Sequence, residues 1–213
     1  MHILKEGLSI GILLAGLVNS IYGIPFVAVY TITSQRKRNG LYWSFLYLLG
    51  NSLAYMFIML LILVRGEDLL GFTSNLKPLF SFLISIISLF IAFVLFLTSF
   101  ISDNRNDFLA WFFLDVLITG ALIFLLGFLM GFYLGKNVEG VAIYLKSLSS
   151  SSLLLSLSTI LFCLGTFVSP LYIIGAFFQV FTIYVSTVEE RRLFDLLSFL
   201  LLVIIGLLFY FRR

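Results

Sequence analysis

The stretch Leu41–Val64 reads LYWSFLYLLGNSLAYMFIMLLILV and contains no charged residue; the nearest charges on either side are Arg38 and Arg65. About 20 helical residues cross the roughly 30 Å hydrocarbon core of a bilayer, so this stretch is long enough to span one. In hydrocarbon, backbone amides are satisfied only in a helix or a closed barrel, and the stretch lacks the polar–apolar alternation of a barrel strand. It is therefore predicted to be a transmembrane helix.

The rest of the chain has the same character. Hydrophobic residues make up 62% of the 213 positions, charged residues make up 11%, and the mean hydropathy is +1.17. Soluble domains of this size do not show that balance. Charges bound six apolar runs, which are Leu8–Thr33, Leu41–Val64, Leu79–Ile101, Phe108–Leu134, Leu153–Val185 and Leu193–Phe211. The sequence therefore predicts an all-α, polytopic bundle of six spans, forming one transmembrane domain over residues 1–213 in the plasma membrane.

The fifth run leaves the number of spans open, because it is longer than one crossing needs and Pro170 lies near its middle. Either a tilted or broken helix passes through, or Ser169 and Pro170 turn a hairpin and the bundle has seven spans. We favour six.

Two prolines within apolar runs, Pro25 and Pro170, each remove an amide donor and free a carbonyl about one turn earlier. Polar and small residues accompany them: Asn19, Ser20 and Gly23 near the first, and Gly165, Thr166 and Ser169 near the second. In transporters, such breaks line a substrate or ion site near the midplane. A kink satisfied by neighbouring side chains is an equally good interpretation.

Three further polar side chains fall inside apolar runs. Asp115 is the acidic residue placed furthest inside one, and a carboxylate there faces protein or water and is a candidate for proton or cation coupling. The alternative is a carboxylate near the membrane surface, in the first turns of its helix. Asn51 and Gln179 each need a hydrogen bond across helices or a polar cavity.

Small residues recur at four-residue spacing and predict faces of close helix packing. They are Gly7, Gly11, Ala15, Asn19 and Gly23 in the first run and Gly127, Gly131 and Gly135 in the fourth, with a similar stripe of Ser81, Ser85 and Ser88 in the third.

The residue types available exclude several kinds of chemistry. One histidine, His2, and one cysteine, Cys163, supply neither a clustered metal site nor a catalytic Ser-His-Asp set nor a dithiol pair. We therefore expect no cofactor, no metal and no enzymatic activity. The excess of basic residues lies in loops, where it marks membrane topology, so a nucleic-acid partner is not expected.

The opening of the chain resembles the lysine-exporter superfamily, which includes MarC-type proteins and the CcdA/DsbD thiol-electron carriers. The resemblance lies in LAGLVNSIYGIP (14–25), the basic loop RKRNG (36–40) and Gly50-Asn51 in the second run. It covers about the first 60 residues and implies a bundle of roughly six spans with Asn19 and Pro25 in a substrate path. Tyr22 stands where a thiol carrier would have its first cysteine, so the resemblance does not extend to thiol relay.

These features predict a secondary transporter or exporter of a small polar solute or ion. Its substrate pathway comprises Asn19, Ser20, Gly23, Pro25, Asn51, Asp115, Thr166, Ser169, Pro170 and Gln179. The alternative is a structural or accessory subunit whose small-residue faces pack against other membrane subunits or a second copy of the chain. A lipid-modifying membrane enzyme is disfavoured by the lack of catalytic sets.

Overall fold

The computed structural model describes residues 2–21, 40–65, 71–101, 108–148, 152–170 and 188–211, with 172, 173, 176, 177 and 180. Within these residues the fold is all-α, as predicted, with seven helices and no strand. The helices are α1 (His2–Ile21), α3 (Gly40–Arg65), α4 (Phe72–Ile101), α5 (Phe108–Tyr133), α6 (Gly135–Leu148), α7 (Ser152–Phe167) and α9 (Val188–Phe211).

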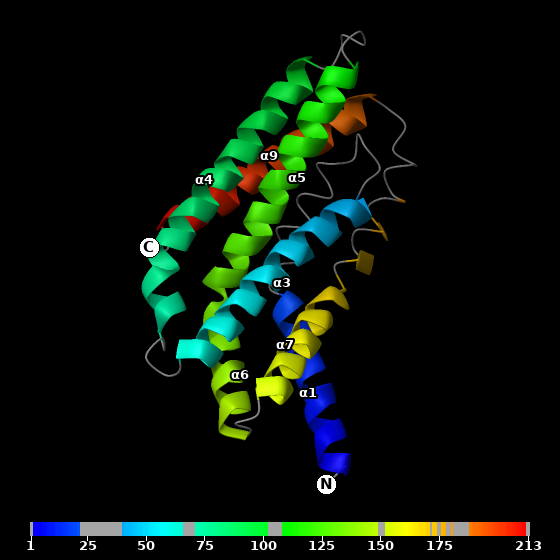
Figure 1. Cartoon of the computed structure of the whole chain (residues 1–213). Coiled ribbons are helices and arrows are strands. Elements are labelled where there is room, and N and C mark those ends of the chain that lie inside the picture. The colour runs from blue at the N-terminus through cyan, green and yellow to red at the C-terminus, as the bar shows by residue number, and fades with distance from the viewer. Residues whose placement is uncertain are drawn as a thin grey trace.

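Neighbouring helices form a row in the order α9, α4, α5, α3, α7 and α1, and each packs on the next (Figure 1). The closest association is between α3 and α5, followed by α4 with α9 and α1 with α7. The short helix α6 continues from the lower end of α5 and packs mainly on α3.

Two helical segments are long and apolar enough to cross a membrane unaided, Leu41–Val64 in α3 and Phe72–Phe93 in α4. Gly120–Tyr133 and Gly135–Ser147 form a third span if they are taken together across a bend of 58°. Among the described residues this gives two or three spans, fewer than the six predicted from the sequence. Ile10–Ile21, Leu155–Phe167 and Phe199–Phe211 are apolar but shorter, and residues 22–33, which complete the first run, lie outside the described part.

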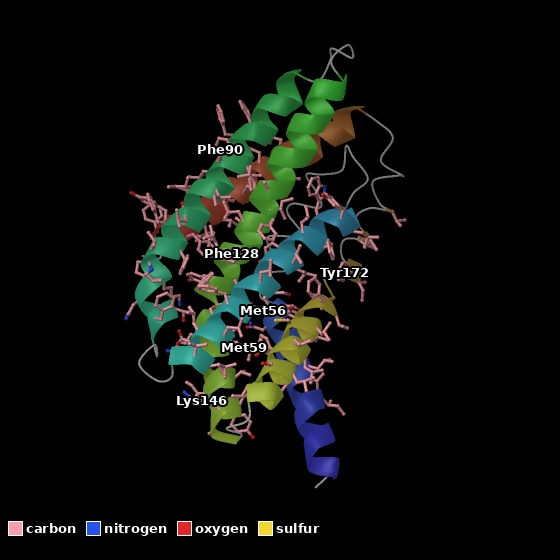
Figure 2. The ribbon with its side chains drawn as sticks, viewed as in Figure 1. Met56, Met59, Phe90, Phe128, Lys146 and Tyr172 are labelled. Atoms are coloured by element: carbon pink, nitrogen blue, oxygen red, sulfur yellow. The ribbon has the colours of Figure 1, made fainter. Side chains whose placement is uncertain are left out.

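Helix α6 lies between the fourth and fifth apolar runs, where the sequence predicted no helix. Val138, Ala142 and Leu145 recur at three- and four-residue spacing and are buried, while Lys136 and Lys146 lie exposed on the same helix. An apolar face of this kind is stabilised by packing on the bundle, which is why this comparatively polar stretch is helical. Figure 2 shows Lys146 at the lower end of this helix, away from the bundle.

The helix of the fifth run ends close to Pro170, where the sequence predicted a break. Helix α7 ends at Phe167, and the amides of Tyr172 and Ile173 donate to the carbonyls of Ser169 and Pro170 at 3.2 and 3.0 Å. These bonds close turns directly after the helix. Residues 181–187 are not described, so the choice between six and seven spans stays a prediction.

Two apolar cores share helix α3. The first gathers residues of α3, α4, α5 and α9, including Tyr47, Leu48 and Ile123. The second gathers residues of α1, α3, α5, α6 and α7, including Tyr55 and Phe162. The buried pair Asn51 and Ser52 lies between Leu48 of the first core and Ala54 of the second, so polar groups mark the boundary between them.

Candidate functional site

The two helices that lead into the predicted proline breaks, α1 and α7, pack directly on each other. A Cβ added at Gly16 would overlap the carbonyl oxygen of Phe162, and one added at Gly165 would overlap that of Leu13. Backbones approach this closely only where both residues lack a side chain. The stripe predicted for this helix is wrong at Gly11, since a Cβ there would meet nothing within 4 Å. Ala15 does pack against the second core, but the closest backbone contact is made by Gly16, which the stripe did not include.

Close approach of α1 and α7 brings two predicted site residues together. The hydroxyls of Ser20 and Ser169 are hydrogen-bonded to each other at 2.9 Å, and the Ser20 hydroxyl also lies 2.6 Å from the carbonyl of Leu17. Both serines are buried. The polar residues near the two breaks, 149 positions apart in sequence, thus meet inside the protein.

A second set of hydrogen bonds joins α7 to α3. The hydroxyls of Ser52 and Thr166 lie 2.5 Å apart, and Thr166 donates to the carbonyl of Cys163 at 2.6 Å. The Cys163 thiol in turn donates to the Ser52 carbonyl at 3.6 Å. Thr166 is one of the site residues predicted from the sequence, and Ser52 is not. A polar residue next to Asn51 within an apolar run is the feature by which Ser52 could have been predicted.

A third contact joins α1 to α6, where the side-chain amide of Asn137 donates to Oδ1 of Asn19 at 3.3 Å. Asn19 is buried and Asn137 is exposed. Asn137 was also missed, because the sequence places it in a polar stretch that looks like a loop. We call the residues of these three contacts the polar junction: Asn19, Ser20, Ser52, Asn137, Thr166 and Ser169.

Asn51, which directly precedes the junction residue Ser52 in α3, is fully buried, but neither its amide nitrogen nor its oxygen forms a hydrogen bond within the described residues. The buried hydroxyls of Tyr47 and Tyr55, four positions before and after it, form none there either. Tyr55 lies one turn along the same helix face, which makes it a neighbour of the Asn51 side chain.

A buried carboxylate absent from the sequence prediction, Glu139, ties α6 to the start of α4. Its Oε1 accepts hydrogen bonds from the Thr73 amide at 2.9 Å and the Thr73 hydroxyl at 2.5 Å, and its Oε2 accepts one from the Gly71 amide at 3.3 Å. Amides at the start of a helix have no partner within it, and its dipole favours a negative charge there. Gly71 has a φ of 83°, which a residue with a Cβ rarely adopts.

The remaining predicted site residues are only partly placed. Pro170 follows Ser169 at the end of α7, beside the junction. Asp115 lies in α5, but its side chain is outside what the structure describes, as are Gly23, Pro25 and Gln179 altogether. The described residues therefore bring together Asn19, Ser20, Thr166 and Ser169, and place Asn51 beside Ser52.

The chemistry of this region is that of neutral hydrogen bonding. Hydroxyls and amides donate and accept, and within the described part of the chain no three His, Cys, Asp or Glu side chains gather as metal ligands would. No protein-family model matches the chain, and no similar protein was found among curated sequences or solved structures.

Proposed function

We propose that the protein is a small secondary transporter or exporter of a polar solute or ion, working as a six-span bundle in the plasma membrane. The observation that carries this proposal is the contact between Ser20 and Ser169, because it joins polar residues beside two predicted helix breaks. Broken helices that meet inside a bundle are how transporters build a solute site in the membrane. The likeness of residues 14–40 to the lysine-exporter superfamily supports the same proposal.

The arrangement of the polar junction suits a site that opens and closes. Here the hydroxyls of α1, α3 and α7 satisfy one another, as a closed site requires in a medium without water. A solute with hydroxyl or amide groups exchanges these bonds for equivalent ones, and each exchange changes the free energy by only about 1 kcal/mol. Movement of α1 with α7 against α3 breaks the Ser52–Thr166 bond, which therefore lies at the moving boundary.

The alternative is an accessory subunit of a larger membrane complex, and one observation favours it. The same hydroxyls that suit a closed site also suit permanent packing, and Gly16 and Gly165 hold the two backbones in contact. In that case the hydrogen bonds of the polar junction hold the helices together permanently, and the apolar outer faces contact partner subunits.

Flux into proteoliposomes distinguishes these proposals. We expect the purified chain to move a neutral or charged solute from a panel, with the half-saturating concentration raised several-fold by Ser169→Ala and unchanged by Ser147→Ala. Ser147 is the matched control because its hydroxyl is exposed and, within the described residues, donates to the carbonyl of Tyr144 one turn earlier on the same helix. Asp115→Asn tests coupling and is expected to abolish uphill transport. Absence of any flux, with partner subunits co-purifying stoichiometrically, would overturn transport in favour of the accessory role.

A further inference from the structure

Helix α3 carries a row of three polar side chains that the polar junction does not use. Tyr47, Asn51 and Tyr55 follow one another at four-residue spacing, which places them on one helix face, and each is 0% exposed. They run from the first apolar core, through the boundary between the cores, into the second. We call these three residues the α3 polar row.

The side-chain amide of Asn51 lies in the middle of the row and has the largest number of unpaired hydrogen-bonding positions. An asparagine side chain has two N–H donors and an oxygen with two lone pairs, and no atom of the described residues completes a hydrogen bond with any of them. The Tyr55 hydroxyl is near, but one hydroxyl meets at most one or two of these four positions. Buried polar groups are normally paired, because removing them from water without compensation is costly.

The surroundings show what kind of partner fits. Gly131 of α5 faces the amide, and a Cβ there would lie 3.0 Å from Oδ1 of Asn51. Phe162 of α7 packs edge-on against the ring of Tyr55, with the centroids 5.7 Å apart. Tyr47 and Tyr55 lie one turn before and one turn after Asn51 on the same helix face. These neighbours combine neutral hydrogen-bonding groups with aromatic walls and supply no counter-charge.

We infer that the α3 polar row is a binding site for a small neutral solute carrying an amide or hydroxyl group, with Asn51 as its central contact. A primary amide pairs with the Asn51 side chain through one donated and one accepted hydrogen bond, and the tyrosine hydroxyls complete the set. An ion in the same place lacks a compensating charge among these groups and loses its hydration at great cost. The inference rests on the proposed transport function and narrows its solute from polar or ionic to neutral.

Ligand-observed NMR on the purified full chain in detergent tests this binding separately from transport. The probes are acetamide, acetate and methylammonium, which are similar in size and differ in charge. We expect saturable binding of acetamide alone, weakened about tenfold by Tyr55→Phe and lost in Asn51→Leu. The matched control is Ser88→Ala, because the buried Ser88 hydroxyl on α4 also forms no hydrogen bond within the described residues.

Three results overturn the inference: saturable binding of either charged probe, binding of no probe, or acetamide binding that survives Asn51→Leu. If Asn51→Leu does not fold, Tyr55→Phe decides, since it removes one oxygen and keeps the ring against Phe162. Proteoliposome flux distinguishes the two proposals. Transport of ions without acetamide binding removes the inference alone, and acetamide binding without any flux removes the transport function alone.

Discussion

Two helix pairs, α3 with α5 and α1 with α7, are both packed through close contacts of glycine with the backbone of the other helix. They differ in the hydrogen bonding of the polar side chains beside those contacts. At the first, Cβ atoms added to Gly50 and Gly127 would overlap the carbonyl oxygens of Phe124 and Tyr47, and at the second Gly16 and Gly165 make equivalent contacts. Beside the α1–α7 contact the hydroxyls of Ser20 and Ser169 are paired and Nδ2 of Asn19 has no partner within the described residues, whereas beside the α3–α5 contact both polar atoms of the Asn51 amide are unpaired there. Glycine therefore sets how closely helices approach, and the side chains next to it decide whether the contact is saturated or can still bind something.

The largest effect is expected at the first crossing. Gly127→Ala forces the backbones of α3 and α5 apart, so the free energy of unfolding should fall by about 3 kcal/mol or more, at the upper end of overpacking costs. Reversible unfolding in mixed micelles with increasing dodecyl sulfate measures this.

Gly140→Ala is the matched control, because a Cβ there meets nothing within 4 Å. Alanine stabilises a helix relative to glycine by about 0.5–1 kcal/mol, so this variant should unfold at an equal or higher denaturant concentration. Equal losses in both variants would show that the α3–α5 contact is looser than described.

A smaller effect is expected where α6 meets α4 through a charge. Glu139→Ala removes the acceptor of the Thr73 and Gly71 amides and should lower the free energy of unfolding by about 2 kcal/mol. Glu139→Gln keeps one carbonyl oxygen and should lose roughly half as much in the same assay. If Glu139→Gln is as stable as the unsubstituted protein, the carboxylate charge contributes nothing at this helix start.

Next in size is the bond between α3 and α7. Thr166→Val and Ser52→Ala should each lower the free energy of unfolding by about 1 kcal/mol, and the double variant should lose less than the sum. Interhelical hydrogen bonds in membranes average about 0.6 kcal/mol in such cycles, which is the coupling expected here. Strict additivity would mean that the two hydroxyls do not interact.

The smallest effect is expected at the exposed edge of the polar junction. Asn137→Ala removes a 3.3 Å bond that water can replace, so the free energy of unfolding should change by about 0.5 kcal/mol or less. A loss above about 1.5 kcal/mol in the micelle assay would instead make Asn137 a principal link between α1 and α6.

The sequence predicted helix packing well where small residues recur at four-residue spacing, because in a membrane helix this pattern indicates a closely packed face. The stripe Gly127, Gly131 and Gly135 predicted a close-packed face, and each of these residues contacts another helix. Ser81, Ser85 and Ser88 were likewise predicted to face neighbouring helices, and all three are buried, with Ser81 bonded to the carbonyl of Phe209 in α9.

The sequence did not predict the hydrogen-bond partners and contacts of side chains, because these depend on which helices pack against each other. Asn51 required a partner or a polar site, and the sequence alone could not say which, because that depends on α5 and α7. Glu139 was missed since its partners are backbone amides of another helix, which no sequence pattern marks. Gly16 was missed because the spacing of Gly11 and Ala15 drew attention to the adjacent face.

The partnership of α1 with α7 also bears on how the protein is made. α1 is synthesised before α7, and the residues that cover its glycine and serine lie about 150 positions later. At about 5 to 20 residues per second, roughly 7 to 30 s of translation separate them. During that interval the face formed by Gly16, Asn19 and Ser20 has no α7 to cover it, so α1 reaches its final packing only late in the synthesis of this chain.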